Sequence, residues 1–178
     1  MSKSNKVMKW ARILHALTIA AMVLLPIAII GGFLTTPLEP EAIQSTIGDI
    51  TVSADTTRGH LFTAVALNLI TSFILILTLN EMRKLFAAYT KGDVLTDKSA
   101  EIIQRIGQGF LALAIVPLVV RPIQTVLLTL ANPPGERSIA IGIDSDMLFF
   151  ALAGGLIIVI GWAMREASAV ASENKSFV

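Results

Sequence analysis

The sequence has no cysteine and few charged or aromatic residues. Of its 178 residues, 15% are charged and 6% are aromatic, whereas 54% are hydrophobic. The lack of cysteine excludes disulfide frameworks, thiolate metal sites and cysteine nucleophiles. A soluble domain has about a quarter of its residues charged, so the low charge argues against a water-soluble fold. The formal net charge of +1 gives no indication of direct nucleic-acid binding.

Four apolar runs are long enough to cross a bilayer, which takes about 20 residues in a helix. They are 13–34, 61–79, 110–130 and 147–164, and Arg121 is the one fixed charge inside them. The first run follows a basic segment, as in a signal peptide, but it is longer than a signal core of about 7–15 residues. We therefore expect it to be retained. The sequence predicts a single all-α membrane domain, a four-transmembrane-helix bundle whose first partner is the lipid bilayer.

Basic residues accumulate on one side of the predicted spans. The amino-terminal segment, the segment 80–109 and the tail 165–178 carry eleven of the 14 lysines and arginines. The segments 35–60 and 131–146 carry Arg58 and Arg137 together with seven acids. Because cytoplasmic loops have an excess of lysine and arginine, we expect both termini and segment 80–109 in the cytoplasm.

The two outer loops contain short alternating segments. In "RSIAIGID", isoleucines at 139, 141 and 143 alternate with Ala140 and Gly142, and "GDITVSAD" at 48–55 has a similar pattern. An isolated strand cannot satisfy its backbone groups. We therefore predict that the two segments pair as a small extracytoplasmic β-ribbon, with two disordered loops as the alternative.

The second and third runs continue into segment 80–109 with helical spacing. Apolar residues recur from Met82 to Tyr89 at that spacing. Gly92 suits the end of one helix, and Thr96 or Asp97 suits the N-cap of the next. This pattern predicts a cytoplasmic helical hairpin, and the fourth run is expected to continue as a helical tail.

Charged and aromatic residues of the hairpin and tail form a candidate surface for a cytoplasmic regulatory protein. They are Arg83, Lys84, Phe86, Tyr89, Lys91, Glu166 and Glu173. Glu166 and Glu173 are seven residues apart on one helix face, which would let them lie against Arg83 or Lys84, although exposed pairs contribute little. The apolar stripes of these helices are explained equally well as contacts between the extensions themselves.

Arg121 interrupts the third run directly before Pro122. Counted from Arg105 at the inner boundary, it lies about 24 Å along a helix that rises 1.5 Å per residue. The hydrocarbon is about 30 Å thick, so Arg121 falls near its outer side. Its side chain would reach the outer interface or an acid there, Asp144 or Asp146. Two interpretations remain open, an interfacial anchor and a ligand or ion-pathway site.

Small and polar residues inside the runs predict helix contacts. Ala151 and Gly155 form a small-xxx-small pair, explained equally by contacts within one chain and by a homo-oligomer. Interhelical hydrogen bonds are expected from the polar residues of the second and third runs. These residues are Asn68, Thr71, Ser72 and Gln124.

The hairpin and tail also resemble a known family. The sequences "MRKLFAAYTKGDVLTDKSAEIIQRIG" and "REASAVASENKSFV" are similar to those of an uncharacterised bacterial family of small four-span inner-membrane proteins. The resemblance covers the chain from the second run to its end and implies a bacterial inner-membrane location. Members are often encoded beside a small Cro-type helix-turn-helix regulator, which implies a regulatory role. The family brings no catalytic or binding residues.

No enzyme motif is visible, neither HExxH, a Walker loop nor a nucleophile elbow. His15 and His60 fall at opposite ends of the spans and cannot share a metal. The sequence therefore predicts a non-enzymatic membrane protein without cofactor, acting as a sensor or regulatory partner. The alternatives are a small transporter or channel subunit, and an envelope protein that binds lipid or a small ligand near Arg121.

Overall fold

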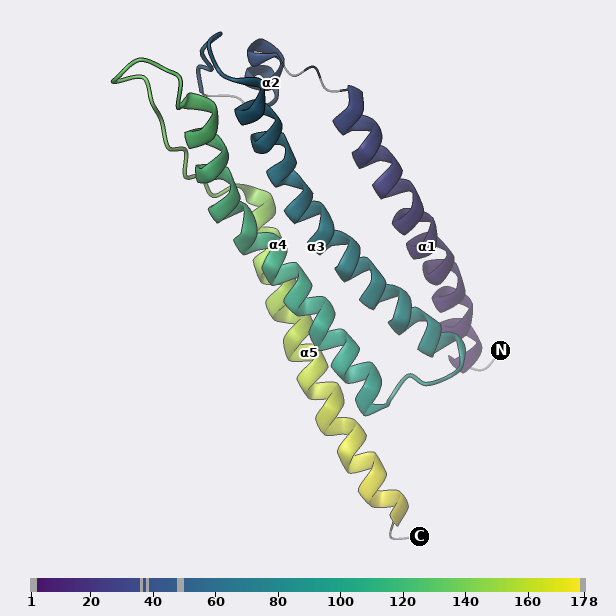
Figure 1. Ribbon diagram of the computed structural model, residues 1–178. Coiled ribbons are helices and arrows are strands. Elements are labelled where there is room, and N and C mark those ends of the chain that lie inside the picture. The colour runs from purple at the N-terminus through teal and green to yellow at the C-terminus, as the bar shows by residue number, and fades with distance from the viewer. Residues whose placement is uncertain (1–2, 36, 38, 48–49, 177–178) are drawn as a thin grey trace.

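The computed structural model describes residues 3–35, 37, 39–47 and 50–176 (Figure 1). Within them the helices are α1 (Lys3–Thr35), α2 (Pro40–Ile47), α3 (Arg58–Thr90), α4 (Asp97–Thr129) and α5 (Ser145–Ser176). All but α2 are long and apolar enough to cross a membrane, which confirms the predicted fold of four long apolar helices. Helices of 32 or 33 residues are about 50 Å long and extend beyond the hydrocarbon of a bilayer.

The four long helices pack in chain order as an open bundle. Extensive contacts join α1 to α3, α3 to α4 and α4 to α5, so α1 and α5 are the outer members (Figure 1). The apolar window of α4 is 33% buried, whereas that of α1 is 6% buried. The outer faces of the four long helices expose many large apolar side chains, and such extensive apolar surfaces are typical of contact with a membrane.

The α3–α4 turn, the first turns of α1 and the last turns of α5 share one end of the bundle, here named the hairpin end (Figure 1). The opposite end, named the loop end, holds α2 and the connections at 50–57 and 130–144. α5 is shifted along the long axis of the bundle toward the hairpin end. It begins beside Arg121 of α4, and its last turns project past the hairpin end (Figure 1). The fold thus gathers the three basic segments at the hairpin end.

The hairpin turn has the caps that its sequence predicts. Gly92 follows α3 with a φ of 91°, a left-handed conformation that favours glycine, and its N–H donates to the carbonyl of Tyr89 at 3.2 Å. Thr96 caps α4, since its hydroxyl oxygen accepts the N–H of Ser99 at 3.1 Å. These caps end one helix and start the next within six residues, 91–96.

Apolar side chains near the hairpin end pack between the helices. The buried members are Leu85, Ile102, Ile103 and Ile106. Packed against them are Met82, Tyr89, Phe110, Ile157 and Met164. The last two belong to α5, so this cluster ties all three helices together. Of the two interpretations of the hairpin's apolar stripes, the structure favours contacts between the extensions.

Facing glycines bring α4 and α5 close together. A Cβ on Gly154 would lie 2.8 Å from the carbonyl oxygen of Gly107, and a Cβ on Gly107 would lie 2.7 Å from that of Gly154. Around Gly155, by contrast, a Cβ would meet nothing within 4 Å. As a contact within one chain, the predicted small pair of Ala151 and Gly155 is therefore wrong by one position, because the register with α4 turns Gly154 inward. The homo-oligomer interpretation of this pair stays a prediction.

The predicted β-ribbon is not formed, since residues 50–53 and 137–144 are not strands in the structure. Gly48 and Asp49 of the first segment lie outside the described residues. The next part of that segment is held instead by the side chain of Asn132, which is 2% exposed. Its Oδ1 accepts the N–H of Ser53 at 3.0 Å, and its Nδ2 donates to the carbonyl of Thr51 at 2.7 Å. One side-chain amide thus replaces a neighbouring strand.

The second segment of the predicted ribbon docks on α4. The hydroxyl of Thr129 accepts the N–H of Ser138 at 3.2 Å, and the hydroxyl of Thr125 accepts the N–H of Ala140 at 3.0 Å. Threonines one helical turn apart therefore satisfy backbone groups that the ribbon would have paired. The exposed side chains of this segment are Ile139, Ile141 and Ile143. Side chains of this segment do alternate between two faces, but one face is exposed and the other packs against α4.

Gly154→Ala is expected to lower the thermal midpoint of the detergent-purified protein, since its methyl group would overlap the backbone carbonyl of Gly107. Such overpacking costs about 1–3 kcal/mol. Gly155→Ala is the matched control and is expected to leave the midpoint unchanged, because its methyl group meets open space. Equal midpoints for the two variants would contradict the assigned α4–α5 packing.

Candidate functional site

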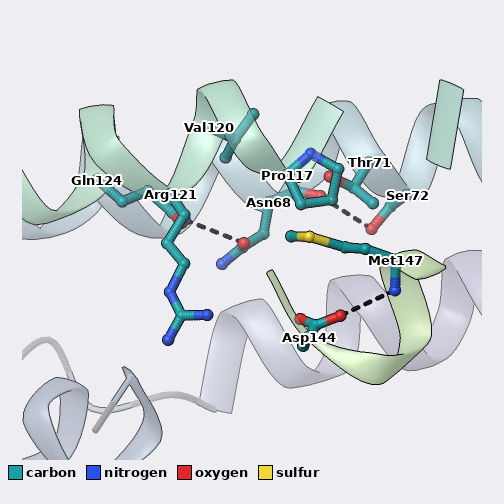
Figure 2. Close-up of a pocket in the computed structure, with 9 residues that line it drawn as sticks. All are labelled: Asn68, Thr71, Ser72, Pro117, Val120, Arg121, Gln124, Asp144 and Met147. Atoms are coloured by element: carbon teal, nitrogen blue, oxygen red, sulfur yellow. Dashed lines mark hydrogen bonds between the residues drawn. The ribbon is translucent and has the colours of Figure 1, made fainter. Parts of the chain in front are cut away.

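A cavity of about 370 Å³ lies between α3, α4 and the start of α5 (Figure 2). Its lining residues are Asn68, Thr71, Ser72, Pro117, Val120, Arg121, Gln124, Asp144 and Met147. Six of these nine side chains are polar or charged, although the helices are apolar over most of their length. The four residues predicted to hydrogen-bond between helices are thus gathered around Arg121.

Arg121 has a half-buried guanidinium without an acidic partner. The side chain extends from α4 toward the segment that precedes α5 (Figure 2), where a Cβ on Gly142 would lie 3.3 Å from its Nη1. Glycine at 142 therefore leaves room for the guanidinium. The described part of the chain has two ion pairs within 4.0 Å, and both lie toward the hairpin end.

Asp144 lines the same cavity, but its carboxylate serves α5. Its Oδ1 accepts the N–H of Met147 at 2.9 Å and so caps the helix start (Figure 2). Asp146 is exposed in the first turn of α5 and does not line the cavity. The structure brings Arg121 and Asp144 together without joining them in an ion pair, and it leaves Asp146 outside.

Gln124 links α4 to α3 and orients Asn68. Its side chain is buried, and its Nε2 donates to the carbonyl of Ala64 at 2.8 Å and to Oδ1 of Asn68 at 3.0 Å. The predicted interhelical hydrogen bond is therefore confirmed for this pair. Because Oδ1 of Asn68 accepts this bond, its Nδ2 stays available as a donor.

A second hollow of about 750 Å³ lies at the hairpin end, between the last turns of α3 and the first turns of α4. Its cations are Arg83, Lys84, Lys91, Lys98 and Arg105, and these five residues define what we name the cationic groove. Its acids are Glu81, Asp93 and Glu101. Within the groove, Lys84 pairs with Glu81 at 2.5 Å and Arg105 pairs with Glu101 at 2.6 Å. The remaining three cations form no such pair.

Two members of the cationic groove were missed by sequence reasoning. Lys98 and Arg105 lie on α4, seven residues apart, so they share one helix face. That spacing was the feature of the sequence from which both residues could have been assigned to the groove. The predicted hairpin then brings this face beside Arg83, Lys84 and Lys91 of α3 and the turn.

The other predicted surface residues lie elsewhere. Tyr89 packs into the apolar cluster, and the half-buried Phe86 does not line the groove. Glu166 is exposed on α5 and makes no ion pair with Arg83 or Lys84. The side chain of Glu173 lies outside the described residues.

Arg83 is instead held within α3, because its Nη2 donates to Oδ1 of Asn80 at 3.0 Å. The tail is joined to α4 rather than to α3. The hydroxyl of Ser168 donates to the carboxylate of Asp97 in the first turn of α4. The tail therefore packs away from the cations that it was predicted to meet.

Comparisons with protein-family models, curated proteins and solved structures find no match to this chain. The resemblance to the four-span family therefore stays a prediction. The cavity around Arg121, which we name the loop-end cavity, and the cationic groove are the features of the molecule from which function can be inferred.

Gln124→Leu is expected to destabilise the purified protein by about 0.5–2 kcal/mol, because interhelical hydrogen bonds of this kind contribute about that much. The carbonyl of Ala64 would lose its side-chain donor, and the side chain of Asn68 would lose the hydrogen bond that orients it. The measurement is the thermal midpoint in detergent. Gln108→Leu, at an exposed position of α4, is the control and should have no effect. An equal shift in both variants would show that the Gln124 bonds are not what matters.

Proposed function

We propose that this protein is a non-enzymatic integral membrane protein that acts as a sensor or regulatory partner of a cytoplasmic protein. The cationic groove is the surface that the partner binds. The observation that supports this proposal is the gathering of five cations around one hollow, with two of them neutralised by neighbouring acids. The groove therefore favours an acidic segment of another protein.

The proposal places the hairpin end in the cytoplasm and the chain in a bacterial inner membrane. Eleven of the 14 lysines and arginines belong to the three segments that meet at the hairpin end (Figure 1). Cytoplasmic segments next to membrane spans carry such an excess. A soluble partner would therefore reach the groove from the cytoplasm.

The chemistry of the groove indicates how a partner is selected. Lys91 and Lys98 are exposed and have no acidic partner, so they are free to bind carboxylates of another protein. A single exposed ion pair contributes about 0–1 kcal/mol, so several pairs must form together. Complementary charge of this kind sets the association rate and excludes wrong partners more than it adds affinity.

Reversing the charges of Lys91 and Lys98 is expected to reduce the recovery of cross-linked partner from intact cells roughly tenfold, since two attractive pairs become repulsive. The measurement is in-cell cross-linking followed by mass spectrometry at matched expression. Lys6→Glu with Lys9→Glu is the control, because it makes the same change in net charge on exposed residues of α1.

The control separates docking from general electrostatics. Partners recovered with wild-type yield from the Lys91→Glu, Lys98→Glu variant would refute the groove as the docking surface. Equal loss in both double variants would also refute it, because attraction to anionic lipid headgroups acts on all basic residues near the membrane surface.

A further inference from the structure

We propose that the loop-end cavity and the neighbouring α1–α3 groove together bind one phospholipid whose headgroup carries both a phosphate and an ammonium group. The cavity would hold the headgroup, and the groove would hold the start of an acyl chain. This site lies at the opposite end of the bundle from the cationic groove, so it is independent of the partner surface.

The charges of the cavity select a headgroup with both signs. Arg121 and Asp144 line one cavity of about 370 Å³, yet they do not approach within 4.0 Å of each other. An anion alone would meet the Asp144 carboxylate, and a cation alone would meet the Arg121 guanidinium. A headgroup with a phosphate for Arg121 and an ammonium for Asp144 satisfies both charges, and arginine binds phosphate strongly.

Neutral donors beside Arg121 complete the phosphate side of the cavity. Asn68 presents its Nδ2, because Gln124 holds its oxygen at 3.0 Å. Thr71, whose side chain carries a hydroxyl, lines the same space one turn along α3. A donor that is fixed before binding loses little freedom on binding, which favours affinity.

An apolar groove lies beside this cavity, between α1 and α3. Its first part is lined by Ala28, Ile29, Gly32, Val65, Asn68, Leu69 and Ser72. Its second part is lined by Pro26, Ile29, Ile30, Leu69, Ser72, Phe73 and Ile76. Asn68 and Ser72 border both the polar cavity and the groove, so the two lie on adjoining faces of α3.

The groove has the length and access that an acyl chain needs. From Asn68 to Ile76 is eight residues of α3, or about 12 Å of helix at 1.5 Å per residue. α1 is the least buried long helix and packs extensively on α3 alone. A lipid can therefore enter sideways from the bilayer, and a polar cavity beside an apolar groove fits an amphiphile better than a soluble ion.

The test is native mass spectrometry of the detergent-purified protein with phosphatidylethanolamine and phosphatidylglycerol of identical acyl chains. Both lipids have the phosphate, but the second lacks the ammonium. We expect the wild-type protein to retain phosphatidylethanolamine at least tenfold better. Arg121→Gln should lower retention of that lipid about tenfold, because its phosphate loses its cation. Asp144→Asn should abolish the preference between the lipids while keeping the cap on Met147, since asparagine also caps helices.

Two controls locate the site. Arg58→Gln removes an exposed cation in the first turn of α3 and should leave both lipids retained as in the wild-type protein. Ala28→Trp fills the groove beside α3 and should lower retention of both lipids. Soluble phosphoethanolamine, measured by calorimetry, should bind far more weakly than the lipid because it lacks the acyl chains.

Several results would overturn the proposal. Wild-type retention in Arg121→Gln would remove the phosphate site, and equal retention of both lipids by the wild-type protein would remove the ammonium site. Binding of soluble phosphoethanolamine without retention of either lipid would refute a lipid ligand. If Arg121→Gln cannot be purified folded, the ratio of the two lipids in Asp144→Asn decides, since a preference that survives there contradicts the role of Asp144.

Discussion

Away from water, a backbone or side-chain polar group without a partner costs several kcal/mol, because no water is there to replace it. Side chains of α4, and of Asn132 three residues beyond its end, supply hydrogen-bond partners for their neighbours. Gln124 bonds to α3, while Thr125 and Thr129 bond to the segment before α5. Asn132 holds the segment before α3. α4 is thus both the most buried span and the main source of polar contacts around it.

Local patterns predicted the helices well, because each depends on residues close in the chain. The apolar runs, the cap at Thr96 and the glycine after α3 all act within a few residues. The β-ribbon failed for a different reason. Alternating isoleucines indicate that an extended segment has two different faces, but they do not indicate which part of the protein covers the inner face. Here threonines of α4 cover it. Likewise, Gly154 and Gly155 are adjacent, and the register with Gly107 alone decides which of them is packed.

The candidate site was predictable in part. Counting the helix rise gave the level of Arg121, and Asp144 does lie in the same cavity. The spacing could not reveal that Asp144 caps α5 and so leaves the guanidinium without an ion pair. At the hairpin end, Arg83, Lys84 and Lys91 do line one groove, whereas Tyr89 turned to the apolar cluster. Helical spacing alone assigns a face, and only packing shows whether that face is exposed.

The offset of α5 has a mechanical consequence. The helix starts at Ser145, directly after Asp144 of the loop-end cavity, and runs without an interior proline to the projecting tail. A helix is stiff along its axis, so an axial shift at its first turn is carried nearly undiminished to its last. The part of α5 that borders the cavity and the projecting tail therefore belong to one rigid element, whose two ends keep a fixed separation.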